Sequence, residues 1–272
     1  LDTGELDKKL THDKSTARLI LTDGVFSMDG TISQVAKLQM LASKHKATVV
    51  IDDAHGIGVL GKHGRGCTEN QLAEDTILIG TLSKAFGVFG AFIAAKQDVI
   101  EWCIQRARPY IYTTALPPSL AEAARTSLRL VHEESWRREK LQLLVKRFRK
   151  HAKQIDLPIS SSVTPIQPII FGSSAIALKA SAELLDKGIM IPAIRPPTVP
   201  QNTARLRISF SAAHTEAHVD QLLDSLAEVI KSIYKNNQQE QTFDAYLDNE
   251  YLATHEILYL FFQLLLLLLA KG

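Results

Sequence analysis

Short apolar runs alternate with helix-like segments along the first 95 residues of the chain. Four runs have the length and continuous apolar character of buried strands: residues 17–21, 48–51, 76–79 and 90–95. Between the first two runs, residues 33–45 carry apolar side chains at helical spacing. Apolar strands separated by helices are typical of a largely parallel sheet that is covered on both faces. The pattern therefore predicts an α/β fold for this part of the chain.

The second half of the chain has a different pattern. A long helical stretch is expected over residues 119–155, after the Pro117-Pro118 pair. Strands near residues 166–171 and 204–210 then combine with two helices, 175–187 and 216–234, as in a small α+β domain. We expect three regions: an α/β domain with a connecting helix (1–150), a C-terminal small domain (151–234) and an atypical tail with an apolar leucine-rich helix (235–272).

Chemically useful side chains follow three of the predicted strands. Ser27 comes after the first strand, Asp52 and His55 after the second, and Lys84 after the third. Ligands of α/β proteins gather at the carboxyl ends of the strands, so these residues predict one shared site. A lysine can form a Schiff base with an aldehyde cofactor, and an acid can hold a pyridinium nitrogen protonated. With a hydroxyl such as that of Thr81 for a phosphate, these are the requirements of a pyridoxal-phosphate (PLP) site.

A plainer interpretation exists for each motif taken alone. Asp52 and His55 can cap a buried strand, and Lys84 can be an ordinary surface lysine. The occurrence of both motifs in this order favours the PLP site.

Composition excludes several other classes of function. The 272 residues carry a formal charge of +2 with 22% charged residues, which is ordinary for a soluble protein, and no basic tract indicates nucleic-acid binding. Cys67 and Cys103 are the only cysteines, which favours a reducing, cytoplasmic location over a disulfide framework. His214 and His218 lack the glutamate of the His-Glu-x-x-His motif, so we expect no metal site.

The two ends of the sequence are unusual. The chain has no initiator methionine and reads as part of something longer. Near the other end, the apolar run 257–270 contains six consecutive leucines but is short for a membrane span, which needs about 20 residues. We favour a packed or interfacial helix there; a short membrane anchor and a non-native tail are the alternatives.

Seven sequence motifs resemble those of one enzyme family and follow one another in the same order as in that family. They lie at residues 23–30, 52–56, 61–67, 81–85, 112–118, 195–200 and 205–209. Together they make the chain similar, over residues 1–232, to the α-oxoamine synthases, which are PLP enzymes of fold-type I. The Arg-Pro-Pro-Thr-Val-Pro loop at 195–200 favours the members that use a pimeloyl thioester over those that use glycine.

The resemblance implies a role for each residue near the cofactor. Lys84 would bind PLP covalently and then act as acid and base at the substrate α-carbon. Asp52 would pair with the pyridine nitrogen, and Thr81 would donate to the phosphate. His55 and Ser27 would hydrogen-bond near the phenolic oxygen of the cofactor.

The resemblance also implies how substrates and subunits are arranged. Thr113 or Thr114 would reach a phosphate across the interface of a homodimer. Arg207 would clamp the α-carboxylate of the amino acid, because a guanidinium can bind it with two hydrogen bonds. Arg195 and Thr198 would face the acyl substrate.

The implied reaction is a decarboxylative condensation of L-alanine with a pimeloyl thioester, carried by coenzyme A or an acyl carrier protein. Its product would be 8-amino-7-oxononanoate, an intermediate of biotin biosynthesis, made by a cytoplasmic transferase. Two alternatives stay open: another α-oxoamine synthase of the glycine C-acyltransferase type, and an inactive truncated paralogue that acts as an interaction module. The family's Gly-rich phosphate loop and ring-stacking histidine are not found ahead of Ser27. We therefore expect this chain alone to bind PLP poorly and to be inactive.

Overall fold

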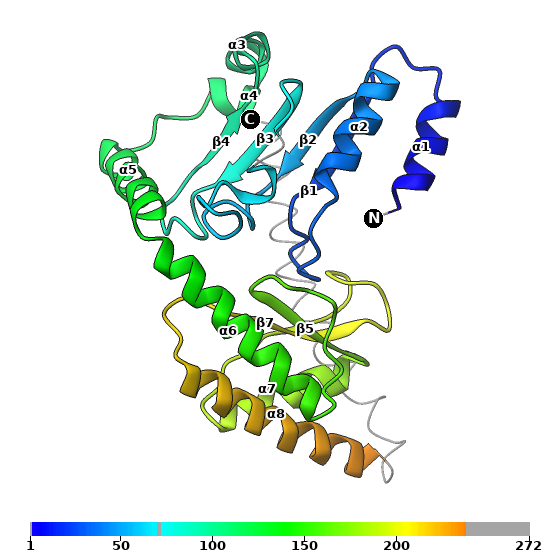
Figure 1. Cartoon of the computed structure of the whole chain (residues 1–272), viewed down its shortest axis with the longest axis vertical. Coiled ribbons are helices and arrows are strands. Elements are labelled where there is room, and N and C mark those ends of the chain that lie inside the picture. Colours follow the sequence, from blue (N-terminus) through cyan, green and yellow to red (C-terminus); the bar gives the residue numbers. More distant parts are fainter. Residues whose placement is uncertain (1, 70–71, 238–272) are drawn as a thin grey trace. The chain divides into compact units, whose positions relative to one another are not determined.

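The computed structural model describes residues 2–69 and 72–237 and divides into two compact units (Figure 1). The first unit contains Leu1–Arg147, Ser160–Gln167 and Ser209–Thr215. The second contains Phe148–Ile159, Pro168–Ile208 and residues 216–237. The leucine-rich run at 257–270 lies outside the described residues. Within the described ranges, no helix is long and apolar enough to cross a membrane.

The first unit is built around a four-stranded sheet in the order β1-β2-β3-β4. Its strands are β1 (Leu19–Asp23), β2 (Thr48–Asp52), β3 (Thr76–Thr81) and β4 (Ala91–Ala94). The β1–β2 and β2–β3 pairs are parallel, and the β3–β4 pair is antiparallel. The connection from β3 to β4 has no crossover helix, which a parallel pair would need. The four predicted strands and the largely parallel arrangement are confirmed.

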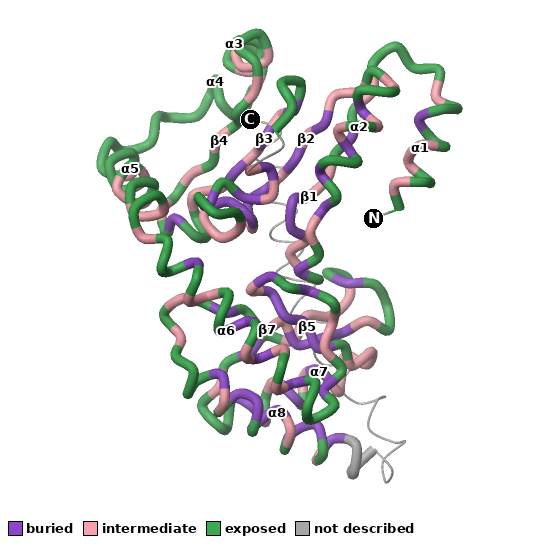
Figure 2. Tube along the Cα trace, viewed as in Figure 1, coloured by how far each residue is buried: buried purple, intermediate pink, exposed green. Residues whose placement is uncertain are grey.

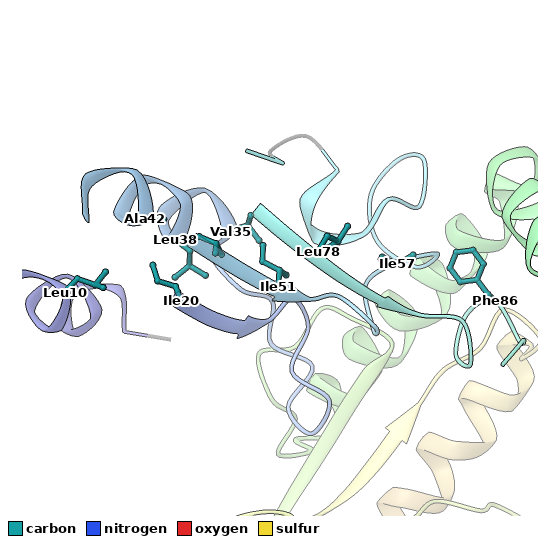
Figure 3. Packing of buried hydrophobic residues seen from close by; sticks show 10 residues of the cluster. Leu10, Ile20, Val35, Leu38, Ala42, Ile51, Ile57, Leu78 and Phe86 are labelled. Atoms are coloured by element: carbon teal, nitrogen blue, oxygen red, sulfur yellow. The ribbon is translucent and has the colours of Figure 1, made fainter. Parts of the chain in front are cut away.

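One face of this sheet is covered by α2 (Val35–His45). Val35, Leu38 and Ala42 of the helix are buried, and they pack in one cluster with alternate residues of the strands, such as Ile20 and Ile51 (Figure 3). The helix ends at Lys46, whose left-handed backbone lets its N–H and the next one bond the last carbonyl groups. The helix predicted over residues 33–45 is thus confirmed, two residues shorter at its start.

The polar segment before the first strand forms a helix that the sequence pattern did not indicate, α1 (Thr3–His12). The carboxylate of Asp2 caps it by accepting from the N–H groups of Gly4 and Glu5, both at 2.9 Å. Leu10 is the buried residue of this helix and joins the cluster under α2. Leu6 packs against the same cluster, so two leucines four residues apart and one cap define α1 within a mostly polar segment.

Four further helices follow the sheet along the chain, and the last of them continues into the second unit. They are α3 (Gln97–Arg106), α4 (Arg108–Ile111), α5 (Pro118–Glu133) and α6 (Ser135–Gln154), with the short 3-10 helix η1 (Gly66–Thr68) lying earlier, between β2 and β3. The single stretch predicted over 119–155 is two helices, because Glu134 leaves the helical region with φ −107° and ψ 61°. Neither α3 nor α5 has a buried residue (Figure 2).

The second unit contains a three-stranded sheet in the order β5-β7-β6. Its strands are β5 (Ile166–Gly172), β6 (Ala193–Ile194) and β7 (Ala204–Ser209), and its helices are α7 (Ser174–Asp186) and α8 (Glu216–Asn237). Ile169, Leu184, Leu206 and Leu226 are fully buried and form much of its core. Gly188 has φ +78° and its N–H bonds the carbonyl of Leu185, so it ends α7 as predicted.

Candidate active site

The carboxyl ends of the first three strands gather acidic and hydroxyl side chains on one face of the sheet. Asp23 of β1 is the register partner of Asp52 of β2, and Asp52 is the partner of Ile79 of β3. Because side chains alternate along a strand, Thr81 lies on the same face as Ile79. Asp52 is half-buried, and its Oδ1 accepts from the N–H of Ala54 at 3.0 Å. The side chains of Asp23, Asp52 and Thr81 therefore share one face at one edge.

Lys84 lies in the turn that joins β3 to β4. This turn is held by main-chain bonds from Leu82 to Gly90 and from Val88 to Leu82, both 2.8 Å long. The lysine side chain is exposed. Burial and the charge of Asp52 raise the pKa of Asp23, whereas the charge of Lys84 lowers it. Lys84 is thus within electrostatic reach of the acids at the strand ends, as the strand order predicts.

Thr81 offers an unused hydroxyl at this place. Its Oγ1 is buried and has no hydrogen-bond partner among the described residues. A buried polar atom without a partner costs about 1–3 kcal/mol. A phosphate oxygen that accepted this hydrogen bond would remove the cost, so the hydroxyl fits the phosphate of the expected cofactor.

Ser27 lies in a tight hairpin after β1. Phe26 donates to Thr31 at 2.9 Å, and Val25 and Ile32 form an isolated bridge. The tip of the hairpin is held at Gly30, whose carbonyl accepts from the hydroxyls of Ser162 and Thr164 at 3.1 Å each. Both hydroxyls are buried.

His55 follows Asp52 by three residues, in the turn after β2. It is half-buried, as is Ser27. Both residues therefore lie in loops that leave the carboxyl ends of neighbouring strands, where the sequence predicted them.

Thr113 and Thr114 belong to the first unit but to an exposed segment between α4 and α5. The hydroxyl of Thr113 donates to the carbonyl of Pro109. Their contact with a cofactor stays a prediction.

Arg195, Thr198 and Arg207 belong to the second unit. Arg195 begins a turn in which its carbonyl accepts from the N–H of Thr198 at 3.0 Å. Arg207 is half-buried on β7, and burial lowers the pKa of its guanidinium. Strand alternation puts Arg205 on the same face as Arg207, but Arg205 is only 4% exposed, and its Nε donates to the carbonyl of Thr203. The roles of these residues toward substrates stay predictions.

Two acids beside Asp52 were not singled out from the sequence. Asp23 is next to it across the sheet, and Asp53 follows it in the chain but is fully buried. Burial raises the pKa of Asp53 to about 6. The run of polar residues at both strand ends was the available signal, but only the strand register shows that Asp23 reaches the site.

Among the described residues, no group of three or more His, Cys, Asp or Glu side chains could hold a metal ion.

The known proteins that this chain resembles are consistent with the site described above. The 8-amino-7-oxononanoate synthase of Nitrosococcus oceani is 50% identical over 232 residues, which is 84% of this chain and 62% of that protein. The enzyme of the same name from Ectopseudomonas mendocina is 53% identical over 77% of this chain and 55% of that protein. The chain thus spans about 60% of the length of such relatives.

Solved structures show the same fold. The 8-amino-7-oxononanoate synthase of Francisella tularensis is 31% identical, with a TM-score of 0.73 over 85% of this chain and 68% of that one. A serine palmitoyltransferase described with a PLP internal aldimine is 30% identical, with a TM-score of 0.80 over 85% of this chain and 60% of that one. These likenesses confirm the predicted fold class and the resemblance found in the motifs. The model of the family "Aminotransferase class I and II" matches residues 1–226, so the chain belongs to that family.

Proposed function

We propose that this chain carries the lysine-bearing part of a PLP-dependent acyltransferase that makes 8-amino-7-oxononanoate for biotin biosynthesis. The observation that carries the proposal is the grouping of Lys84, Asp23, Asp52 and the unpaired hydroxyl of Thr81 at one edge of the sheet. Curated relatives of that name, about half identical to this chain, support it.

The cofactor, when bound, supplies an electron sink for charge on the substrate α-carbon. Lys84 would hold it and move the proton at that carbon. Asp52 would keep the pyridine nitrogen protonated, because a carboxylate in a half-buried site interacts strongly with the positive ring. Ser27 and His55 would hydrogen-bond the phenolic oxygen, and Thr81 the phosphate.

The substrates would be L-alanine and a pimeloyl thioester. Arg207 would bind the amino-acid carboxylate, since a partly desolvated guanidinium forms strong paired hydrogen bonds. Arg195 and Thr198 would hold the acyl chain. The α-carbon of alanine forms a bond to the acyl carbon, the thiol leaves, and carbon dioxide is lost from the former carboxylate.

The enzyme would work as a cytoplasmic homodimer in which Thr113 or Thr114 of one subunit reaches the phosphate held by the other. The exposed aromatic side chains around these threonines support such an interface. Tyr110 is 65% exposed and Tyr112 is 77% exposed. Large apolar side chains that gather on a surface are typical of interaction sites.

Borohydride trapping tests the cofactor part of the proposal. Reduction after incubation with excess PLP fixes even a weakly held imine, and peptide mass analysis then locates it. We expect the label on Lys84 and its loss in Lys84→Ala. Lys96 is an internal control, because it is also in the first unit but is engaged by Asp75 at 2.5 Å. A label spread evenly over Lys96 and other lysines would contradict the proposal.

An amino-acid titration tests the substrate. L-alanine should change the absorbance of the bound cofactor at lower concentration than glycine or L-serine. A preference for glycine or L-serine would favour another α-oxoamine synthase, an alternative that the serine palmitoyltransferase structures keep open.

Two arginine variants divide the substrate roles. In a protein extended to the length of its relatives, Arg207→Ala should raise the Michaelis constant for alanine at least about tenfold, and Arg195→Ala should do the same for the thioester, because a lost charge pair costs about 2–5 kcal/mol. Equal effects of both changes on both substrates would refute this assignment.

A further inference from the structure

Asp53 is a fully buried acid between two residues of the proposed site, Asp52 and His55. Its main chain directly follows β2 and forms hydrogen bonds both to β3 and to the turn that carries His55. The N–H of Asp53 donates to the carbonyl of Ile79 at 2.9 Å, and its own carbonyl accepts from the N–H groups of Gly56 and Ile57, both at 3.0 Å. The turn that carries His55 is therefore closed onto Asp53.

The carboxyl group of Asp53 lies where three loops meet. Its Oδ2 accepts from the N–H of Cys67 at 2.8 Å, in η1, and its Oδ1 has no partner among the described residues. Three glycines pack directly against it: a Cβ on Gly24, Gly56 or Gly66 would lie 2.3, 2.0 or 1.8 Å from a carboxylate oxygen. Gly24 follows β1, Gly56 lies in the turn after β2, and Gly66 begins η1. The carboxyl group thus fills a space bordered by the backbone of three glycines and by the side chain of Cys67.

We propose that Asp53 is a positioning residue whose carboxyl group fixes the turn carrying Asp52 and His55 against the loop after β1 and against η1. The inference rests on the proposed function for the roles of Asp52 and His55. Asp53 contacts neither substrate nor cofactor, because Gly24, Gly56 and Gly66 enclose it.

The groups facing Asp53 favour its neutral form. Burial raises the pKa of Asp53, and the charge of Asp52 raises it further, whereas hydrogen bonds from Cys67 act in the opposite direction. The Cys67 thiol is itself held neutral, since burial and Asp53 raise its pKa. On β1, the acid is Asp23, the register partner of Asp52. The proposed role of Asp53 rests on the packing and the hydrogen bond of its side chain, and not on its protonation state.

The test compares three variants of the full chain by hydrogen–deuterium exchange and by PLP titration. Asp53→Ala removes the packing and the Cys67 bond. We expect exchange at residues 54–57 and 67 to rise at least tenfold and the dissociation constant for PLP to rise at least tenfold. Asp53→Asn keeps the shape and an acceptor for Cys67, so both quantities should stay within about threefold of the wild type.

Glu69→Gln is the matched control. Glu69 holds the neighbouring loop by accepting from the N–H of His63 at 2.8 Å, and this loop lies outside the proposed site. The variant should leave exchange at residues 54–57 and PLP binding unchanged.

Two results would overturn the positioning role. One is exchange at residues 54–57 that stays within twofold of the wild type in Asp53→Ala. The other is an Asp53→Asn variant that keeps normal exchange yet loses PLP affinity tenfold, because charge would then be the active property. Should Asp53→Ala fail to fold, Asp53→Asn still separates the role of shape from the role of charge. A protein extended to the length of its relatives that takes no PLP contradicts the proposed function alone, since the exchange measurements test the positioning role without cofactor.

Discussion

The two faces of the β1–β4 sheet are built by alternate residues of the same strands, yet the side chains on the two faces differ strongly in how far they are exposed. On the face under α2, Ile20 and Ile51 are 6% and 0% exposed. On the other face, Leu19 and Leu21 are 62% and 71% exposed within the described chain. Asp23, Asp52 and Thr81 belong to this open face. One face therefore packs in the core and stabilises the unit, and the other carries the side chains of the proposed site.

The adjacent acids Asp52 and Asp53 repeat this difference at the scale of one peptide bond. Alternation sends Asp52 to the open face, where it is half-buried, and Asp53 toward the covered side, where it is fully buried. Under the proposed function, the same type of side chain would thus serve recognition at one position and packing at the next.

The largest effect is expected on the covered face. Ile51→Ala should lower the free energy of unfolding by about 2–5 kcal/mol, because it removes a buried side chain and leaves a cavity. Urea denaturation followed by circular dichroism measures this. A loss below about 1 kcal/mol would show that the cluster under α2 is loosely packed.

Asp53 should make stability depend on pH. Its pKa in the folded protein, about 6, is above the ordinary aspartate value of 3.8, so the folded state holds the proton more tightly. The resulting stabilisation is present below about pH 4 and is lost as pH rises through 6. The difference amounts to about 3 kcal/mol. Denaturation midpoints of the wild type and Asp53→Asn between pH 4 and 7 should therefore diverge; parallel curves would contradict the prediction.

Two threonines of β3 should respond in opposite directions to replacement by valine. Thr76 is buried on the covered face, and its Oγ1 accepts from Gln39 Nε2 at 3.1 Å, so Thr76→Val should destabilise by about 1 kcal/mol. Thr81→Val removes an unpaired hydroxyl and should be neutral or stabilising by about 1 kcal/mol, while it weakens PLP binding. Thermal denaturation and PLP titration measure the two quantities. Equal destabilisation by both changes would refute the contrast.

The smallest effect is expected on the open face. Leu21→Ser should change the free energy of unfolding by less than about 0.5 kcal/mol, since its side chain is already largely in solvent. Leu78→Ser, on the covered face of β3, is the control that should be strongly destabilising. A large loss from Leu21→Ser would mean that the open face is covered in solution.

The sequence predicted the strands well because each falls in a short, mainly apolar run, and it placed Asp52, His55 and Lys84 because each follows such a run. It missed α1, because only Leu6 and Leu10 of this polar segment pack in the core. Asp23 needed the register of β1 with β2, and the enclosure of Asp53 needed the approach of η1; both are long-range contacts that local patterns do not encode.

The hairpin that carries Ser27 has a consequence for anyone who compares variants of this protein. A side chain at Gly30 would put a Cβ 2.3 Å from Ser162 Oγ and 2.4 Å from the carbonyl oxygen of Ile166, in a backbone conformation with φ +69° that disfavours side chains. In a library selected only for folding, position 30 should therefore keep glycine. Intolerance at position 30 would therefore record crowding at the hairpin tip, and it should not be counted as a sign of catalytic importance.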